Sequence, residues 1–121
     1  MTETGSTMLT RQGVLVLIPA YNEAASIANV VRGARAHLPV LVVDDGSADD
    51  TTQAAELAGA SVLRQVPNQG KGAALKAGFR WAIEHGYPAV LTLDADGQHD
   101  PAEIPIFLTA YHQQQADLVI G

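Results

Sequence analysis

Short runs of apolar residues alternate along the chain with segments in which apolar residues recur every three or four positions. The first run, residues 13–18, is continuous and rich in β-branched residues, which predicts a strand covered on both faces. Runs at 40–43, 61–64 and 89–93 predict three further strands. Helical spacing predicts helices between them, carrying Ile27 to Leu38, Ala54 to Ala58 and Leu75 to Ile83.

Prolines and turn residues separate these elements. Pro19 is expected to stop the first strand and Pro39 the first helix, with Asn22 as that helix's N-cap. Residues 100–111 predict one turn and then a helix restarting at Pro105, and residues 117–121 predict a fifth strand. The alternation predicts an α/β fold of Rossmann-like βαβ repeats, with a mostly parallel sheet and helices on both faces. We expect one domain, residues 13–121, behind a mobile tail of residues 1–12.

Polar segments follow the predicted strands at their carboxyl ends, where ligands bind in such sheets. Four of them stand out: residues 19–23, 44–50, 70–72 and 94–99. Asp94 and Asp96 share one face of an extended backbone, so both carboxylates can point at one cation. Oxygen ligands of this kind suit Mg²⁺ or Mn²⁺ shared with phosphate oxygens.

An alternative reading treats these acids as ordinary turn and cap residues. That reading accounts well for Asp49 and Asp100. It accounts less well for the adjacent pair Asp44 and Asp45, or for Asp94 and Asp96. Like charges so close together repel each other unless a cation or ligand joins them.

Composition excludes several other classes. The formal net charge is −6 and no basic stripe is visible, which argues against nucleic-acid binding. There is no cysteine, so disulfides and thiolate metal sites are excluded, and a reducing, cytoplasmic location fits. The apolar runs fall far short of the roughly 20 residues that a membrane span needs.

Common nucleotide and metal motifs are also excluded. The dinucleotide-binding pattern G-x-G-x-x-G is absent after the first strand. The Walker pattern fails because Lys71 is followed by Gly72 and not by Ser or Thr. An EF-hand starting at Asp94 fails because Pro105 occupies its twelfth position.

The chain resembles the family 2 glycosyltransferases, which have the GT-A fold, and most of all the transferases that act on dolichol or other polyprenyl phosphates. The resemblance runs from about residue 13 to residue 121. It rests on four motifs in order: Ile18-Pro19-Ala20-Tyr21-Asn22-Glu23, Val42-Val43-Asp44-Asp45-Gly46-Ser47-Ala48-Asp49, Asn68-Gln69-Gly70-Lys71-Gly72 and Leu93-Asp94-Ala95-Asp96-Gly97-Gln98-His99. Catalytic domains in this family are longer, so the resemblance implies the N-terminal, nucleotide-sugar-binding half of a GT-A domain.

The resemblance implies roles for individual residues. Pro19, Tyr21 and Glu23 would line the nucleoside pocket, and Asp44 would accept hydrogen bonds from the base or ribose. Lys71 would neutralise the diphosphate. Two further sets complete the implied site. Asp94 and Asp96 match the DXD carboxylates that bind the metal, with Asp94 also a nucleotide contact, while Asp45, Gln98 and His99 would either contact the ligands or hold the loops in shape.

The implied reaction transfers a sugar from a UDP- or GDP-sugar to an acceptor, either a polyprenyl phosphate or a glycan, with Mg²⁺ or Mn²⁺. The catalytic base is expected beyond Gly121, so no catalytic residue is assigned in this chain. Membrane association, at a cytosolic face, would require segments outside the chain or a partner, and the fifth strand at a sheet edge offers a route to a homo-oligomer. The alternative is a module that binds a nucleotide sugar without turnover. A sugar-nucleotide nucleotidylyltransferase ranks lower, because no basic glycine-rich loop follows the first strand.

Overall fold

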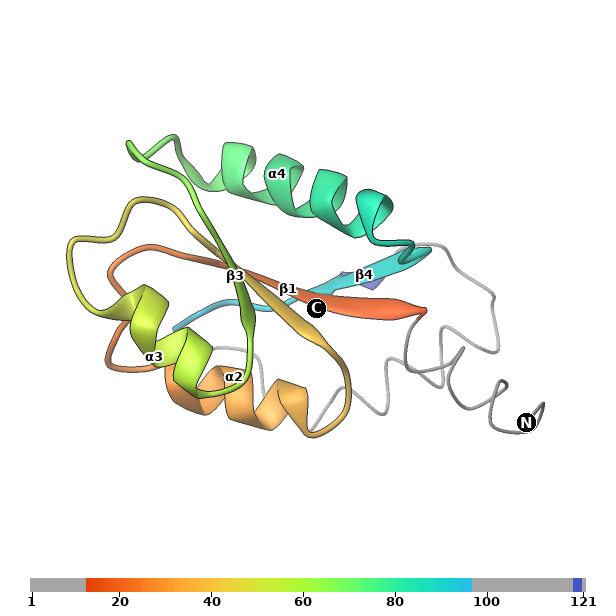
Figure 1. Cartoon of the computed structure of the whole chain (residues 1–121), viewed down its shortest axis with the longest axis horizontal. Helices are drawn as coiled ribbons and strands as arrows, with labels where there is room; N and C mark the ends of the chain where they lie inside the picture. Colours follow the sequence, from red (N-terminus) through yellow and green to blue (C-terminus); the bar gives the residue numbers. More distant parts are fainter. Residues whose placement is uncertain (1–12, 97–118, 121) are drawn as a thin grey trace.

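A five-stranded parallel sheet forms the centre of the protein, as a computed structural model that describes residues 13–96 and 119–120 shows (Figure 1). The strand order is β3-β2-β1-β4-β5, and every neighbouring pair is parallel. The strands are β1 (Val14–Ala20), β2 (Val40–Asp44), β3 (Ser61–Arg64), β4 (Ala89–Thr92) and β5 (Val119–Ile120). The helices are α2 (Ile27–Arg35), α3 (Thr51–Leu57) and α4 (Lys71–Glu84). The predicted α/β class is confirmed.

Helices cover both faces of the sheet, with α2 and α3 on one side and α4 on the other (Figure 1). Val16 and Ile18 of β1 join the core under α2, while Leu15 and Leu17 join the core under α4. Alternate residues of a strand point to opposite faces, so a central strand with both faces covered must be apolar at every position. This explains the continuous apolar run of β1.

The prediction that Pro19 stops the first strand is wrong, because β1 continues through Ala20. The carbonyl of Leu17 accepts a hydrogen bond from Leu93, so the odd-numbered residues of β1 turn their backbone polar groups toward β4. Pairing with β4 ends at Leu17 opposite Thr92. The missing N–H of Pro19 therefore lies on the side where pairing has ended, and β1 continues beside β2 as far as Ala20 opposite Asp44.

The prediction that Asn22 caps the first helix is also wrong. Asn22 has a left-handed backbone (φ 54), and Ser26 precedes the first turn of α2. The side-chain oxygen of Asn22 instead accepts a hydrogen bond from the N–H of Ala48, 2.8 Å away in the loop after β2. A tertiary contact thus replaces the local cap that the sequence suggested.

Strand order determines where a ligand can enter. The chain goes from β1 outward to β2 and β3, then returns through α4 to β4 on the other side of β1. Such a switch point leaves a crevice at the carboxyl ends of the strands on either side of it. The crevice here lies between the ends of β1 and β4.

Several predictions fall outside the described residues: the tail at 1–12, the helix restarting at Pro105, and the side chains of Gln98 and His99. The fifth strand is confirmed in part, since β5 pairs with β4 at one edge of the sheet. Within residues 13–96 and 119–120, none of the helices has the length and apolar character to cross a bilayer.

Candidate functional site

A cleft of about 310 Å³ opens at the predicted crevice. Its walls come from the end of β1, the loop after β2, the first turns of α4 and the segment after β4. The lining residues are Pro19, Ala20, Tyr21, Glu23, Asp45, Lys71, Ala74, Asp94, Ala95 and Asp96. Most of the predicted site residues therefore meet in one place, although they come from four separate parts of the sequence.

The acidic corner of the cleft contains Asp94 and Asp96. Asp96 is exposed, and the side chain of Asp94 is 29% exposed. Ala95 between them is buried, and its carbonyl accepts a hydrogen bond of 2.7 Å from the hydroxyl of Ser26. This bond ties the backbone of the acidic pair to the start of α2.

The donor set fits a hard divalent ion. Among the described residues there is no cluster of three or more His, Cys, Asp or Glu side chains that could hold a metal. Mg²⁺ typically takes only one or two protein carboxylates and completes its shell with water and substrate phosphates. Two carboxylates beside an open cleft are therefore a suitable set for an ion that arrives with a diphosphate.

A basic group faces the acidic corner. The ammonium of Lys71, the first residue of α4, lies 3.3 Å from Oδ1 of Asp94. The Lys71 side chain is 66% exposed. The cleft thus presents a cation and two carboxylates side by side, which suits a phosphate group together with its metal.

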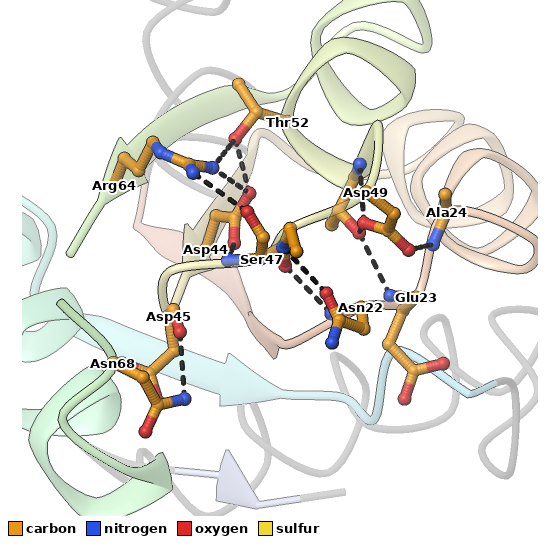
Figure 2. A network of polar contacts seen from close by, with 12 residues as sticks. Asn22, Glu23, Ala24, Asp44, Asp45, Ser47, Asp49, Thr52, Arg64 and Asn68 are labelled. Atoms are coloured by element: carbon orange, nitrogen blue, oxygen red, sulfur yellow. Dashed lines mark hydrogen bonds and ion pairs between the residues drawn. The ribbon is translucent and has the colours of Figure 1, made fainter. Parts of the chain in front are cut away.

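The β1 side of the cleft is held by the loop after β2 (Figure 2). The N–H of Asn22 donates to the hydroxyl of Ser47 at 2.8 Å, and the N–H of Glu23 donates to the hydroxyl of Thr51 at 2.9 Å. The N–H of Ala24 donates to Asp49 at 3.2 Å. These bonds fix the backbone on either side of Tyr21 and Glu23, so a half-exposed Tyr21 ring stands on a well-supported loop.

Asp49 carries a perturbed carboxyl group. Hydrogen bonding from the Thr51 hydroxyl lowers the pKa of Asp49 below its ordinary value, outweighing desolvation, and the N–H groups of Ala24 and Thr51 act in the same direction. The ionised carboxylate thus links the loop before α2 to the first turn of α3.

Asp44 is not on the cleft wall. Its side chain is fully buried, and its carboxylate accepts hydrogen bonds from Arg64 at 3.0 Å, from the N–H of Ser47 at 2.9 Å and from the hydroxyl of Thr52 (Figure 2). The predicted contact of Asp44 with a base or ribose therefore stays a prediction. Arg64 was not expected at this site from the sequence. Arg64 lies opposite Asp44 in the β2–β3 register, which is known only once the two strands have paired.

Asp45 lies on the cleft wall but is only 4% exposed. Its carboxylate accepts hydrogen bonds from Gln65 and from the main chain just before Lys71. The sequence left open whether Asp45 contacts a ligand or shapes its loop. The small residues Ala20, Ala74 and Ala95, which the sequence did not single out, complete the wall.

Comparison with known proteins identifies the class. A family model described as glycosyl transferase family 2 matches residues 15–121. The chain belongs to this family, and its fold is of the GT-A type that the sequence resemblance implied.

Two curated relatives indicate which kind of family 2 glycosyltransferase the chain resembles. The chain is 44% identical over 116 residues to an undecaprenyl-phosphate mannosyltransferase of Micrococcus luteus, covering 89% of this chain and 47% of the relative. It is 40% identical over 128 residues to a polyprenol monophosphomannose synthase of Mycolicibacterium smegmatis, covering 98% and 48%. The resemblance to polyprenyl-phosphate sugar transferases is thereby confirmed. The chain spans about half the length of these relatives.

Among solved structures, the chain resembles glucosyl-3-phosphoglycerate synthase from Mycobacterium tuberculosis in complex with Mn²⁺, UDP and glucosyl-3-phosphoglycerate. The TM-score is 0.67 and the sequence identity 26%, with 85% of this chain and 40% of the other covered. A mycobacterial protein of 24% identity shows the same fold, with a TM-score of 0.70 over 88% of this chain and 39% of that one.

Proposed function

We propose that this chain forms the donor-binding part of a glycosyltransferase that moves a hexose from a UDP- or GDP-sugar to a polyprenyl phosphate. One observation carries the proposal: Lys71, Asp94 and Asp96 share the wall of a single cleft at the switch point of the sheet. A cation beside two carboxylates matches a diphosphate that brings its own Mg²⁺ or Mn²⁺. The solved relative with Mn²⁺ and UDP supports this ligand class.

Each wall of the cleft has its own task in this proposal. Asp94 and Asp96 would hold the metal, and a bound metal would stabilise the departing diphosphate as a Lewis acid. Lys71 would place a positive charge on the same phosphates, in a position that Asp94 helps to set. The negative charge that develops on the leaving group would then be stabilised both by the metal and by Lys71.

The nucleoside end would lie against the β1 wall. Tyr21 is half-exposed there and offers an aromatic face, while Pro19 and Glu23 line the same side. The loop after β2 fixes the backbone of Asn22 and Glu23 by hydrogen bonds, so this wall is preorganised before a ligand arrives.

The acceptor is proposed from the relatives, whose names refer to undecaprenyl phosphate and to polyprenol monophosphomannose. Mannose is accordingly the proposed sugar and GDP-mannose the donor to test first. None of the described residues is assigned as the base that would deprotonate an acceptor. A second candidate is a module that binds a nucleotide sugar without turnover, because the residues of the cleft wall account for donor binding alone.

Calorimetry together with a transfer assay distinguishes the enzyme from the binding module. The chain is titrated with UDP and GDP, with and without Mn²⁺, and incubated with GDP-mannose and undecaprenyl phosphate. Metal-dependent binding with transfer supports the enzyme, and metal-dependent binding without transfer supports the module. A folded sample that binds neither nucleotide in the presence of Mn²⁺ or Mg²⁺ contradicts both.

A further inference from the structure

Asp45 is a buried acid whose carboxylate accepts hydrogen bonds from one segment of chain, residues 65–70. Oδ1 accepts from the N–H of Gln69 at 2.7 Å and from the side-chain amide of Gln65 at 3.0 Å. Oδ2 accepts from the N–H of Gly70 at 2.7 Å. Gly70 directly precedes Lys71, the first residue of α4. We propose that Asp45 is a positioning residue, which holds the 65–70 segment so that Lys71 stays beside Asp94 on the cleft wall.

The backbone around Asp45 supports the same segment. The carbonyl of Asp45 accepts a hydrogen bond of 3.0 Å from the side-chain amide of Asn68 (Figure 2). Gly46 follows with φ +76, and a Cβ there would lie 2.9 Å from the nitrogen of Asn68 and 3.0 Å from the carbonyl oxygen of Gln65. A side chain at position 46 would push the two loops apart. The close approach that Gly46 permits is what brings the Asp45 carboxylate within reach of Gln69 and Gly70.

The chemistry requires a carboxylate. A buried charge is costly unless hydrogen bonds compensate it, and here two main-chain N–H groups and one amide do so. Gly70 is the N-cap position of α4 and has no side chain of its own to accept a bond. The Asp45 carboxylate therefore supplies, from a distant part of the sequence, the negative charge that a helix N-terminus favours. Neutral asparagine cannot replace it, since its NH₂ group would face an N–H donor in either orientation.

The inference rests on the proposed function only where it concerns diphosphate binding. In Asp45→Asn, Lys71 loses its fixed position, so we expect UDP and GDP to bind about tenfold more weakly or worse. Uridine and guanosine, which lack phosphate, should bind to Asp45→Asn as tightly as they bind to the wild type. In a Lys71→Ala background, Asp45→Asn should cause no further loss of diphosphate affinity. Asp50→Asn is the matched control, because it removes one exposed charge from the same loop without a side-chain cap bond.

Amide hydrogen exchange tests the positioning without any ligand. Asp45→Asn should speed exchange at Gln69 and Gly70 about tenfold or more, because each loses all or part of its acceptor. Exchange at Leu17 in the central strand should not change.

If Asp45→Asn does not fold, Gln65→Ala provides a second test, because it removes one donor to the Asp45 carboxylate. Gln65→Ala should weaken diphosphate binding about threefold and leave nucleoside binding unaffected.

Three results overturn the inference. The first is unchanged diphosphate affinity in Asp45→Asn, or in Gln65→Ala if Asp45→Asn does not fold. The second is an equal loss of affinity for nucleoside and diphosphate, and the third is a loss of diphosphate affinity that adds to the loss caused by Lys71→Ala. If the wild type binds neither UDP nor GDP, the proposed function fails. The positioning role is then decided by exchange alone, and unchanged exchange at Gln69 and Gly70 rejects it.

Discussion

The ammonium of Lys71 lies 3.3 Å from Oδ1 of Asp94, although the two residues are 23 positions apart in the sequence. Their side chains are 66% and 29% exposed. Ion pairs this exposed contribute about 0–1 kcal/mol to stability. The position of the pair on the cleft wall therefore fits phosphate binding better than stabilisation of the fold.

Lys71→Ala should separate binding from folding. Loss of one charge-assisted contact should weaken UDP and GDP binding about tenfold or more, as measured by calorimetry. The free energy of unfolding in urea should change by less than about 0.5 kcal/mol, because the ion pair is exposed. Lys76→Ala, an exposed lysine of the same helix, serves as the control. Equal loss of affinity in both variants would point to a general charge effect instead of a specific contact.

Asp96→Asn should abolish the metal-dependent part of nucleotide binding. The melting temperature should stay nearly constant or rise slightly, since one of two neighbouring carboxylates is neutralised. Titration of GDP with and without Mn²⁺, beside a thermal melt, checks both statements. Glu56→Gln, on an exposed part of α3, is the matched charge control. A collapse of the fold in Asp96→Asn would indicate a structural role for this carboxylate.

Asp44→Asn, unlike Asp96→Asn, should lower the stability of the fold. Asp44 is fully buried and bonded to Arg64, Ser47 and Thr52, so the change leaves buried partners unsatisfied. We expect a loss of about 1–3 kcal/mol in the free energy of unfolding, less than for a fully buried ion pair because the Arg64 side chain is 41% exposed. A double-mutant cycle with Arg64→Met in urea measures the pair. A loss below about 0.5 kcal/mol would contradict the structural role.

Gly78→Ala should destabilise the packing of α4 on the sheet. A Cβ at position 78 would lie 2.4 Å from a methyl carbon of Leu17, a fully buried side chain. Overpacking of this kind costs about 1–3 kcal/mol, which urea unfolding can measure. Gly72→Ala in the same helix meets no atom within 4 Å, so it should be neutral or stabilising by up to about 1 kcal/mol. Similar effects at both positions would contradict the packing explanation.

Asp49 predicts a pH dependence of stability. Its pKa is lowered in the folded protein by the Thr51 hydroxyl, so the folded state favours the ionised form. Its contribution should be present above the unfolded pKa of 3.8 and be lost as the pH falls through the lower folded pKa. The difference in unfolding free energy between wild type and Asp49→Asn should therefore be constant at neutral pH and shrink in acid. A difference that does not change with pH would show that the carboxyl charge is irrelevant.

Local sequence patterns determined most of the fold. Apolar runs with β-branched residues identified β1, β2, β3 and β4, and the regular alternation of strands with helical spacing predicted a parallel sheet. Because ligand sites in such sheets lie at the carboxyl ends of the strands, the same patterns placed Tyr21, Lys71 and Asp94 near one another.

Tertiary structure decided what periodicity cannot encode, namely which polar groups find partners far away in the chain. Asn22 looked like a helix cap, yet its N–H donates to the Ser47 hydroxyl and its side-chain oxygen accepts from the N–H of Ala48. Asp44 and Asp45 are adjacent and chemically identical, but alternate residues of an extended backbone point in opposite directions. Asp44 therefore meets Arg64 in the interior, while Asp45 reaches the segment before Lys71. Which of the two acids lies in the interior and which reaches the cleft depends on strand register and loop packing. Both exist only once β2, β3 and α4 have come together.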